Sequence, residues 1–185
     1  MQYFELSTQL LMWSVLLPLL LSNVAHMVLV KKEGLSRWSI PISTKWFGPN
    51  KTYRGLLFVP LANALLFTLL QLVGRSWWEW PSPTANTPAL ELLSIGALYG
   101  MAYVLFELPN SWLKRRLGIA AGQSSRKFAA FFLLLDKSDS ALGVSLAFVL
   151  LNSESIGFWP FFFTAVLLHA SISALLVLLK IKKSF

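Results

Sequence analysis

The sequence predicts an all-α membrane protein with five transmembrane helices, its N-terminus outside the cell and its C-terminus in the cytoplasm. Two observations carry this prediction. First, the 185 residues are 56% hydrophobic and their mean hydropathy is +0.62, values that soluble domains rarely reach. Second, the chain contains five apolar runs, each near the roughly 20 residues that cross a bilayer as a helix. We therefore expect one integral-membrane domain covering residues 1–185.

The five predicted spans follow one another with short polar segments between them. The first run lacks a basic leader and is followed by Lys31 and Lys32 instead of a small-residue cleavage site, so we interpret it as a span and not as a signal peptide. The spans are approximately 7–30, 56–73, 88–108, 128–151 and 158–179.

The basic residues predict the orientation. They gather in segments 31–55 and 109–127 and in the C-terminal tail, whereas the opposite side carries only Arg75, in segment 74–87. Because Lys and Arg are enriched in cytoplasmic loops, the two basic segments and the tail should be cytoplasmic, in a cell (inner) membrane. Basic residues that flank apolar spans favour anions at a membrane surface over nucleic acid, despite the net charge of +8. The Trp-rich stretch 75–83 is predicted to form an interfacial belt on the outer side.

The fourth span contains two aspartates. If it began only after Asp139, the remaining helix to Leu151 would be about 18 Å long at 1.5 Å per residue, against a hydrocarbon core of about 30 Å. Asp136 and Asp139 should therefore lie at or below the membrane surface, where carboxylates usually have a function. They share one helical face with Ser140 and Gly143, and Gly143 would let another helix or a ligand approach closely.

Two carboxylates on one face suit Mg²⁺, which binds through one or two carboxylates together with substrate phosphates. The alternative is that the aspartates pair with Lys114, Arg115 or Lys137 and simply end a helix. Glu107, at the cytoplasmic end of the third span, could be a third metal ligand or could pair with the nearby basic run.

The residues after Glu107 suggest a break in the chain. Pro109 is predicted to bend or end the third span, and Asn110 and Ser111 to cap a following helix. His26 and His169 are predicted mainly to hydrogen-bond between helices. The chain has no cysteine, which excludes disulfides, thiolate metal sites and cysteine nucleophiles.

The stretch WFGPNKTYRG, residues 46–55, has the composition of a phosphate-binding loop. It is not a P-loop, because only Gly48 precedes Lys51 and Thr52 and the spacing is wrong. Lys51, Thr52 and Arg54 could nevertheless donate hydrogen bonds to phosphate oxygens, and Gly55 would allow close packing at the entry to the next helix.

Basic segments and carboxylates thus meet at the cytoplasmic face. That combination favours phosphoryl or nucleotidyl transfer, in which positioning and charge neutralisation supply most of the catalysis. A small transporter or a structural subunit is the alternative from another class, since aspartates within a membrane also line ion paths.

The motifs SNVAH, FGPNKTYRG, ELPNSWLKRRLGI and LDKSDSALG, together with the final span centred on His169, occur in this order over about Ser22 to Lys183. As a set they resemble the CDP-archaeol synthase family, including its bacterial members, which is related to phosphatidate cytidylyltransferases. The resemblance implies a five-helix enzyme that uses CTP and Mg²⁺ to convert a membrane lipid phosphate into a CDP-lipid and pyrophosphate. CTP, the lipid phosphate and the bilayer are then the expected partners, and homodimerisation stays open.

The resemblance also assigns roles to residues by motif. Asp136 and Asp139 match a metal-binding aspartate pair, with Glu107 as the candidate third ligand. The catalytic set would be these two aspartates with Lys51 and Lys114. The residues expected to bind CTP are Lys51, Thr52, Arg54, Asn110, Ser111, Lys114 and Arg115.

The sequence departs from the family pattern at three positions. Glu107 stands where archaeal members tend to carry Asp, Asn50 replaces a Gly, and Tyr53 replaces a Trp. These changes look like the bacterial branch. A CDP-alcohol phosphotransferase is the closest alternative enzyme, but it would carry two more aspartates downstream, and only Glu154 follows Asp139.

Overall fold

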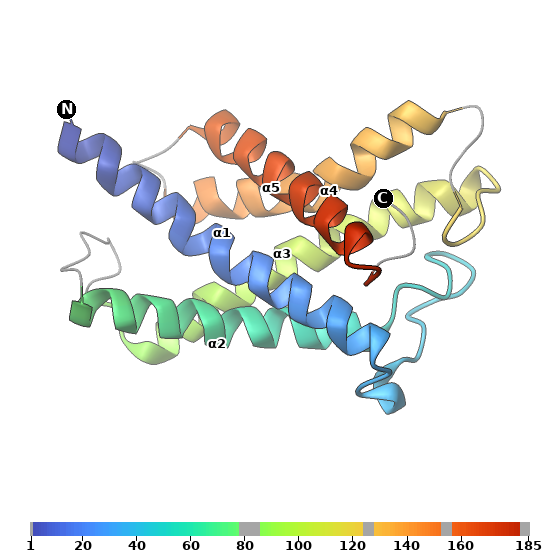
Figure 1. Ribbon diagram of the computed structural model, residues 1–185, viewed down its shortest axis with the longest axis horizontal. Helices are drawn as coiled ribbons and strands as arrows, with labels where there is room; N and C mark the ends of the chain where they lie inside the picture. The colour runs from blue at the N-terminus through green and yellow to red at the C-terminus, as the bar shows by residue number, and fades with distance from the viewer. Residues whose placement is uncertain (1, 78–85, 124–127, 153–156, 182–185) are drawn as a thin grey trace.

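The computed structural model describes residues 2–77, 86–123, 128–152 and 157–181 as a bundle of long helices (Figure 1). Apart from one isolated antiparallel bridge between Pro41 and Thr52, the described chain contains no β-structure. The all-helical prediction is confirmed. The elements are α1 (Gln2–Lys31), the short 3₁₀ helix η1 (Ser36–Trp38), α2 (Tyr53–Trp77), α3 (Ala89–Arg116), α4 (Ala129–Leu151) and α5 (Phe158–Leu178).

Four of these helices, α1, α2, α3 and α5, are long and apolar enough to cross a membrane. Helix α4 has sufficient length, but Asp136, Lys137 and Asp139 put three charges near its middle. Four of the five predicted spans therefore have the length and composition of membrane helices. The crossing by α4 and the orientation of the termini remain predictions.

The helices alternate in direction, so that both predicted cytoplasmic segments lie at one end of the bundle. Figure 1 shows the end of α1, the start of α2, the end of α3 and the start of α4 gathered at the right. The start of α1, the end of α2 and the start of α3 lie at the left of Figure 1. Arg126, Lys127, Lys182, Lys183 and most of the predicted Trp belt fall outside the described residues.

Glycines allow α3 to pack closely on its neighbours. A Cβ at Gly100 would lie 2.6 Å from Pro60 Cα, and one at Gly96 would lie 2.8 Å from Ala64 Cα, both on α2. The Asn63 side chain crosses the same interface and donates to the Gly96 carbonyl at 2.7 Å. Small residues of this kind let membrane helices approach to backbone contact.

Gly143 on α4 has the role that its position suggested. A Cβ there would lie 2.6 Å from the Ala102 carbonyl oxygen and 2.5 Å from the Phe106 ring. The close approach is therefore that of another helix, α3. Helix α3 thus lies between α2 on one side and α4 on the other, with glycine contacts to both.

The prediction that Asn110 caps a new helix is wrong. Helix α3 continues through Pro109 to Arg116, so Asn110 lies inside it. Its side chain points from the side of α3 toward α4. Ser111 also lies within the helix and donates to the Glu107 carbonyl at 3.0 Å. A proline removes one backbone N–H but does not prevent continuation when neighbouring helices support the turn. As a result, Lys114–Arg116 form the last turn of α3 and not a loop.

Replacement of Gly100 by Ala should lower the stability of the protein. The added methyl group would overlap the backbone at Pro60, and overpacking of this kind costs about 1–3 kcal/mol. Thermal unfolding in detergent, followed by tryptophan fluorescence, should show a lower midpoint. Gly157→Ala is the matched control, because among the described residues its Cβ would meet only Pro160 Cδ, at an ordinary 3.6 Å. Equal midpoints for the two variants would contradict the close α2–α3 contact.

Candidate functional site

A cavity of about 700 Å³ opens at the end of the bundle where the basic segments gather. Residues from α1, α2, α3, α4 and α5 and from both connecting segments line it. Its polar and charged lining residues are Asn23, His26, Asn50, Lys51, Thr52, Tyr103, Glu107, Asn110, Ser111, Lys114, Arg115, Gln123, Asp136, Lys137, Asp139, His169 and Ser173.

Asn110 brings the two aspartates together. Its Nδ2 donates to Asp136 Oδ1 and to Asp139 Oδ2, both at 2.7 Å. Asp139 is buried and also accepts a hydrogen bond from the backbone N–H of Ser140 at 2.7 Å. One oxygen of each carboxylate therefore faces the same point. This confirms that the two aspartates share a face of α4.

Two lysines form ion pairs with two of the three carboxylates, Asp136 and Glu107. Lys114 Nζ lies 2.6 Å from Asp136 Oδ2, and Lys51 forms an ion pair with Glu107. The pairing of Asp136 with Lys114 was one of the alternatives, but the aspartates do not end a helix, because both lie within α4. Glu107 pairs with a lysine that precedes α2, and not with the basic run on its own helix.

Lys51 stays charged at neutral pH. Burial lowers the pKa of its ammonium group, but the adjacent Glu107 carboxylate opposes this effect, and the pKa lies above the ordinary value for lysine. A protonated lysine at the cavity wall provides a fixed positive charge for an anionic ligand.

The loop before α2 holds Lys51 and Thr52 in place by backbone pairing. Ile42 N–H donates to the Lys51 carbonyl at 2.8 Å, and Tyr53 N–H donates to the Ile40 carbonyl at 3.0 Å. Gly48 has a φ of +83°, a conformation that favours glycine, and its Cβ position lies 3.5 Å from Arg115 Cδ. The loop thus folds back on itself and packs against the end of α3.

Not every residue predicted to bind phosphate lines the cavity. Arg54 is buried beside it, and its Nη1 donates to the Gly34 carbonyl at 2.9 Å, so this arginine ties the loop to the end of α1. Arg115 does line the cavity, and its Nε is buried without a hydrogen-bond partner among the described atoms. Gly55 packs against His26, whose Cε1 would lie 3.2 Å from a Cβ there, in agreement with close packing at the entry to α2.

The carboxylates fit a hard cation in part. Within the described ranges no group of three or more His, Asp or Glu side chains could hold a metal ion, so Glu107 does not complete a three-carboxylate cluster. The aspartate pair does fit Mg²⁺, because the Asn110 amide already holds one oxygen from each carboxylate close to the other, as a shared cation would require. Asn110 Oδ1 is buried and has no hydrogen-bond partner within the described part of the chain, and an amide flip would turn this oxygen toward the aspartates as a third ligand.

His169 makes the interhelical contact predicted for it. Its Nδ1 lies 3.2 Å from Ser140 Oγ, which joins α5 to α4 one residue after Asp139. His26 Nε2, in contrast, is buried without a hydrogen-bond partner among the described atoms. Both histidines face the cavity.

No protein-family model, curated protein or solved structure matches this chain. The resemblance of its motifs to CDP-archaeol synthases therefore stays a prediction. What the chain can do has to be inferred from the chemistry of the cavity.

The central role of Asn110 was not predicted from the sequence. Glu107, Asn110, Ser111 and Lys114 lie at helical spacing on one face of α3. That pattern is readable in the sequence only if the helix is assumed to pass Pro109. The pairing of Lys51 with Glu107 left no such signal, because 56 residues separate them.

Asn110→Ala should destabilise the metal-free protein. The substitution removes the donor shared by two negative carboxylates, and hydrogen bonds to charged groups contribute about 1.5–3 kcal/mol. Thermal unfolding in detergent with a chelator should show the loss. Ser111→Ala is the control, because it removes only a bond to the backbone of its own helix. If both variants unfold at the wild-type temperature, Asn110 does not hold the pair.

Proposed function

We propose that the chain is a CTP-dependent cytidylyltransferase that converts a membrane lipid phosphate into a CDP-lipid and pyrophosphate. One observation carries the proposal: a single cavity gathers Lys51, Lys114 and Arg115 around the Asp136–Asp139 pair, at the end of a bundle of apolar helices. The ordered motifs that resemble CDP-archaeol synthases support the same function.

The size and charge of the cavity suit a nucleoside triphosphate. Small-molecule pockets usually measure about 300–1,000 Å³, and this one is about 700 Å³. Its cations come from the loop before α2 (Lys51), from the end of α3 (Lys114 and Arg115) and from α4 itself (Lys137). A triphosphate would therefore meet positive charge at several oxygens at once, which is how phosphoryl-transfer sites lower the barrier.

Asp136 and Asp139 would hold Mg²⁺, which when bound neutralises phosphate charge and orients the phosphates. Lys114 already contacts Asp136 and would lie beside the same phosphates. Lys51 and Thr52 would contact the triphosphate from the opposite wall, and Arg115 from the end of α3. Asn110 would keep the two carboxylates in register.

The reaction requires no external oxidant or reductant. An oxygen of the lipid phosphate would attack the α-phosphorus of CTP, forming a new P–O bond. The bond between the α-phosphorus and the bridging oxygen would break, and pyrophosphate would leave with that oxygen. The cations of the cavity would stabilise the charge that develops on the leaving group.

The same proposal includes a fifth span and a cytoplasmic site. Helix α4 has 23 residues, or about 35 Å at 1.5 Å per residue, enough to cross a core of about 30 Å. Asp139 and Lys137 are buried in the protein, as charges within a membrane span usually are. Five spans would place the termini on opposite sides, and the basic segments would place the cavity on the cytoplasmic face of the cell (inner) membrane.

Purified protein should form a CDP-lipid and pyrophosphate from CTP, Mg²⁺ and at least one member of a panel of lipid phosphates. Asp136→Asn and Asp139→Asn should each reduce the product to background, because a neutral amide binds a hard cation far less well than a carboxylate. Mass spectrometry of the lipid extract measures the product, and unfolding midpoints control for folding. Failure of the wild type with every lipid phosphate would refute the function, and full activity of both variants would refute the metal assignment.

Lys51 and Arg54 should respond differently to replacement by alanine. Lys51→Ala should raise the KM for CTP by about tenfold or more, since it removes a charge that contacts the nucleotide. Arg54→Ala should instead lower the unfolding midpoint, because it breaks the contact with Gly34, and should leave the KM for CTP of the folded protein within about twofold. Steady-state kinetics and thermal unfolding of both variants make the comparison. A large KM effect in Arg54→Ala alone would reverse the two assignments.

A further inference from the structure

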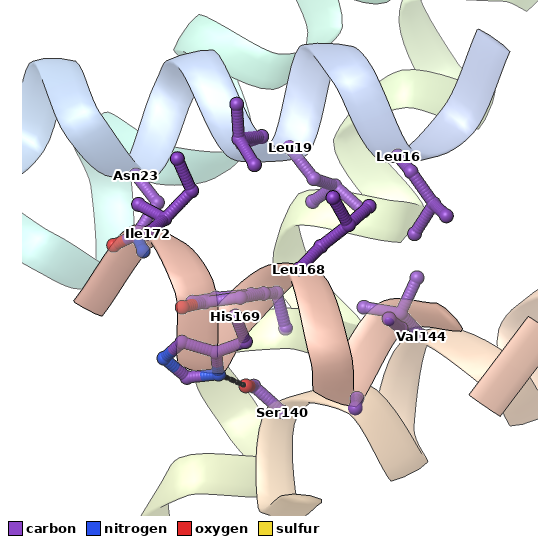
Figure 2. Close-up of a pocket in the computed structure, with 12 residues that line it drawn as sticks. Leu16, Leu19, Asn23, Ser140, Val144, Leu168, His169 and Ile172 are labelled. Carbon is purple, nitrogen blue, oxygen red and sulfur yellow. Dashed lines mark hydrogen bonds between the residues drawn. The ribbon is translucent and has the colours of Figure 1, made fainter. Parts of the chain in front are cut away.

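A second, apolar cavity lies next to the polar one inside the bundle. It measures about 50 Å³ and lies between α1, α4 and α5 (Figure 2). Asn23, Tyr103 and His169 line both cavities. The two spaces are therefore adjacent, and these three side chains stand at the junction.

Two membrane helices, α1 and α5, supply most of the lining of the apolar cavity, and α3 and α4 supply the rest. On α1 the lining residues Leu16, Leu19, Leu20 and Asn23 follow helical spacing, and on α5 Ala165, Leu168, His169 and Ile172 do the same. On α1 the lining face is apolar up to Asn23, whereas on α5 His169 lies between the apolar lining residues Leu168 and Ile172. Both helices continue along the polar cavity, which Met27 on α1 and Ser173 on α5 line.

Along α1 the lining thus changes from hydrocarbon side chains to a polar one. Leu16 and Asn23 are seven positions apart, or about 10 Å at 1.5 Å per residue. Beyond the junction lie Lys51, Lys114 and Arg115. A lipid with an anionic head group and a hydrocarbon chain would place its chain against the apolar residues and its head group near the basic ones.

We propose that the gap between α1 and α5 is the place where the hydrocarbon chain of a lipid phosphate enters, with its phosphate at the junction formed by Asn23 and His169. The inference rests on the proposed function and adds the location of the lipid. Ser140 holds the His169 ring at the junction through Nδ1, which makes His169 a positioning residue for the head group.

The surroundings of the cavity allow a chain to enter from the bilayer. The main neighbour of α1 is α2, and its contact with α5 is slight. Leu21 on α1 and Leu175 on α5 are exposed and do not line the cavity. A cavity of 50 Å³ holds only about two water-sized groups, so it marks the inner end of the path, where the chain would meet the head.

Filling the apolar cavity should weaken the binding of the lipid and leave the binding of CTP unchanged. Leu20→Trp and Ile172→Trp place a bulky ring at partly buried lining positions. Each should raise the KM for a long-chain lipid phosphate by about tenfold, with kcat near wild type and the KM for CTP within about twofold. A short-chain lipid phosphate should be less affected. Leu21→Trp and Leu175→Trp are the matched controls, one residue from α1's Leu20 and three from α5's Ile172, and should behave like the wild type.

A binding measurement separates this inference from the function. Long-chain phosphatidic acid with a diazirine close to its glycerol, in phosphatidylcholine vesicles, should crosslink to α1 and α5 of the wild type without CTP. The two cavity-filling variants, Leu20→Trp and Ile172→Trp, should lose most of this labelling, and the controls should keep it. A fatty alcohol with the same diazirine should label these helices weakly, because it lacks the phosphate.

The outcomes distinguish the two ideas. Labelling confined to α1 and α5 without any CDP-lipid product would support the lipid site and refute the transferase. Two results would refute the lipid site alone while leaving the transferase in place. One is product formation with an unchanged KM for the lipid in both cavity-filling variants. The other is product formation with crosslinks spread evenly over all bilayer-facing helices. Equal labelling by the fatty alcohol would show a general hydrophobic gap and would also refute the lipid site.

Discussion

The structure depends on how charges are satisfied inside an apolar helix bundle. Helix α4 carries Asp136, Lys137 and Asp139 near its middle, and isolated charges there would be costly to remove from water. Helix α3 resolves part of this cost with the amide of Asn110 and the ammonium of Lys114. The close approach that this network needs comes from Gly143, which brings the backbone of α3 against α4. The charged network is therefore both a packing interface and a chemical site.

The same arrangement links packing to function. Gly96 and Gly100 bring α2 against α3, and the loop that leads into α2 thereby delivers Lys51 to Glu107 on α3. Cations from one loop and one helix end then line the same cavity as the aspartates of a third element. A triphosphate bound there would be surrounded by groups already paired with one another, so that little reorganisation would be needed. The apolar gap between α1 and α5 would give a membrane substrate access to the same point.

Much of the fold could be read from the sequence, because long apolar runs have few alternatives in a membrane. The fifth helix was predicted as 158–179 and observed as Phe158–Leu178, and the fourth as 128–151 and observed as Ala129–Leu151. The largest error lay in the third, which was predicted to end at 108 but extends to Arg116. A local rule about proline failed there, because neighbouring helices can support a turn that lacks one hydrogen bond.

By itself, the sequence determined the helices, the segregation of basic residues and the shared face of Asp136 and Asp139, since each follows from composition or from helical period. Tertiary structure alone decided the partners. It gave Lys51 to Glu107, made Asn110 the bridge between the aspartates, turned Arg54 toward Gly34 and placed His169 in the lining of both cavities. The reason is that such contacts join residues far apart in the chain, and only the packing of helices brings those residues within reach of one another.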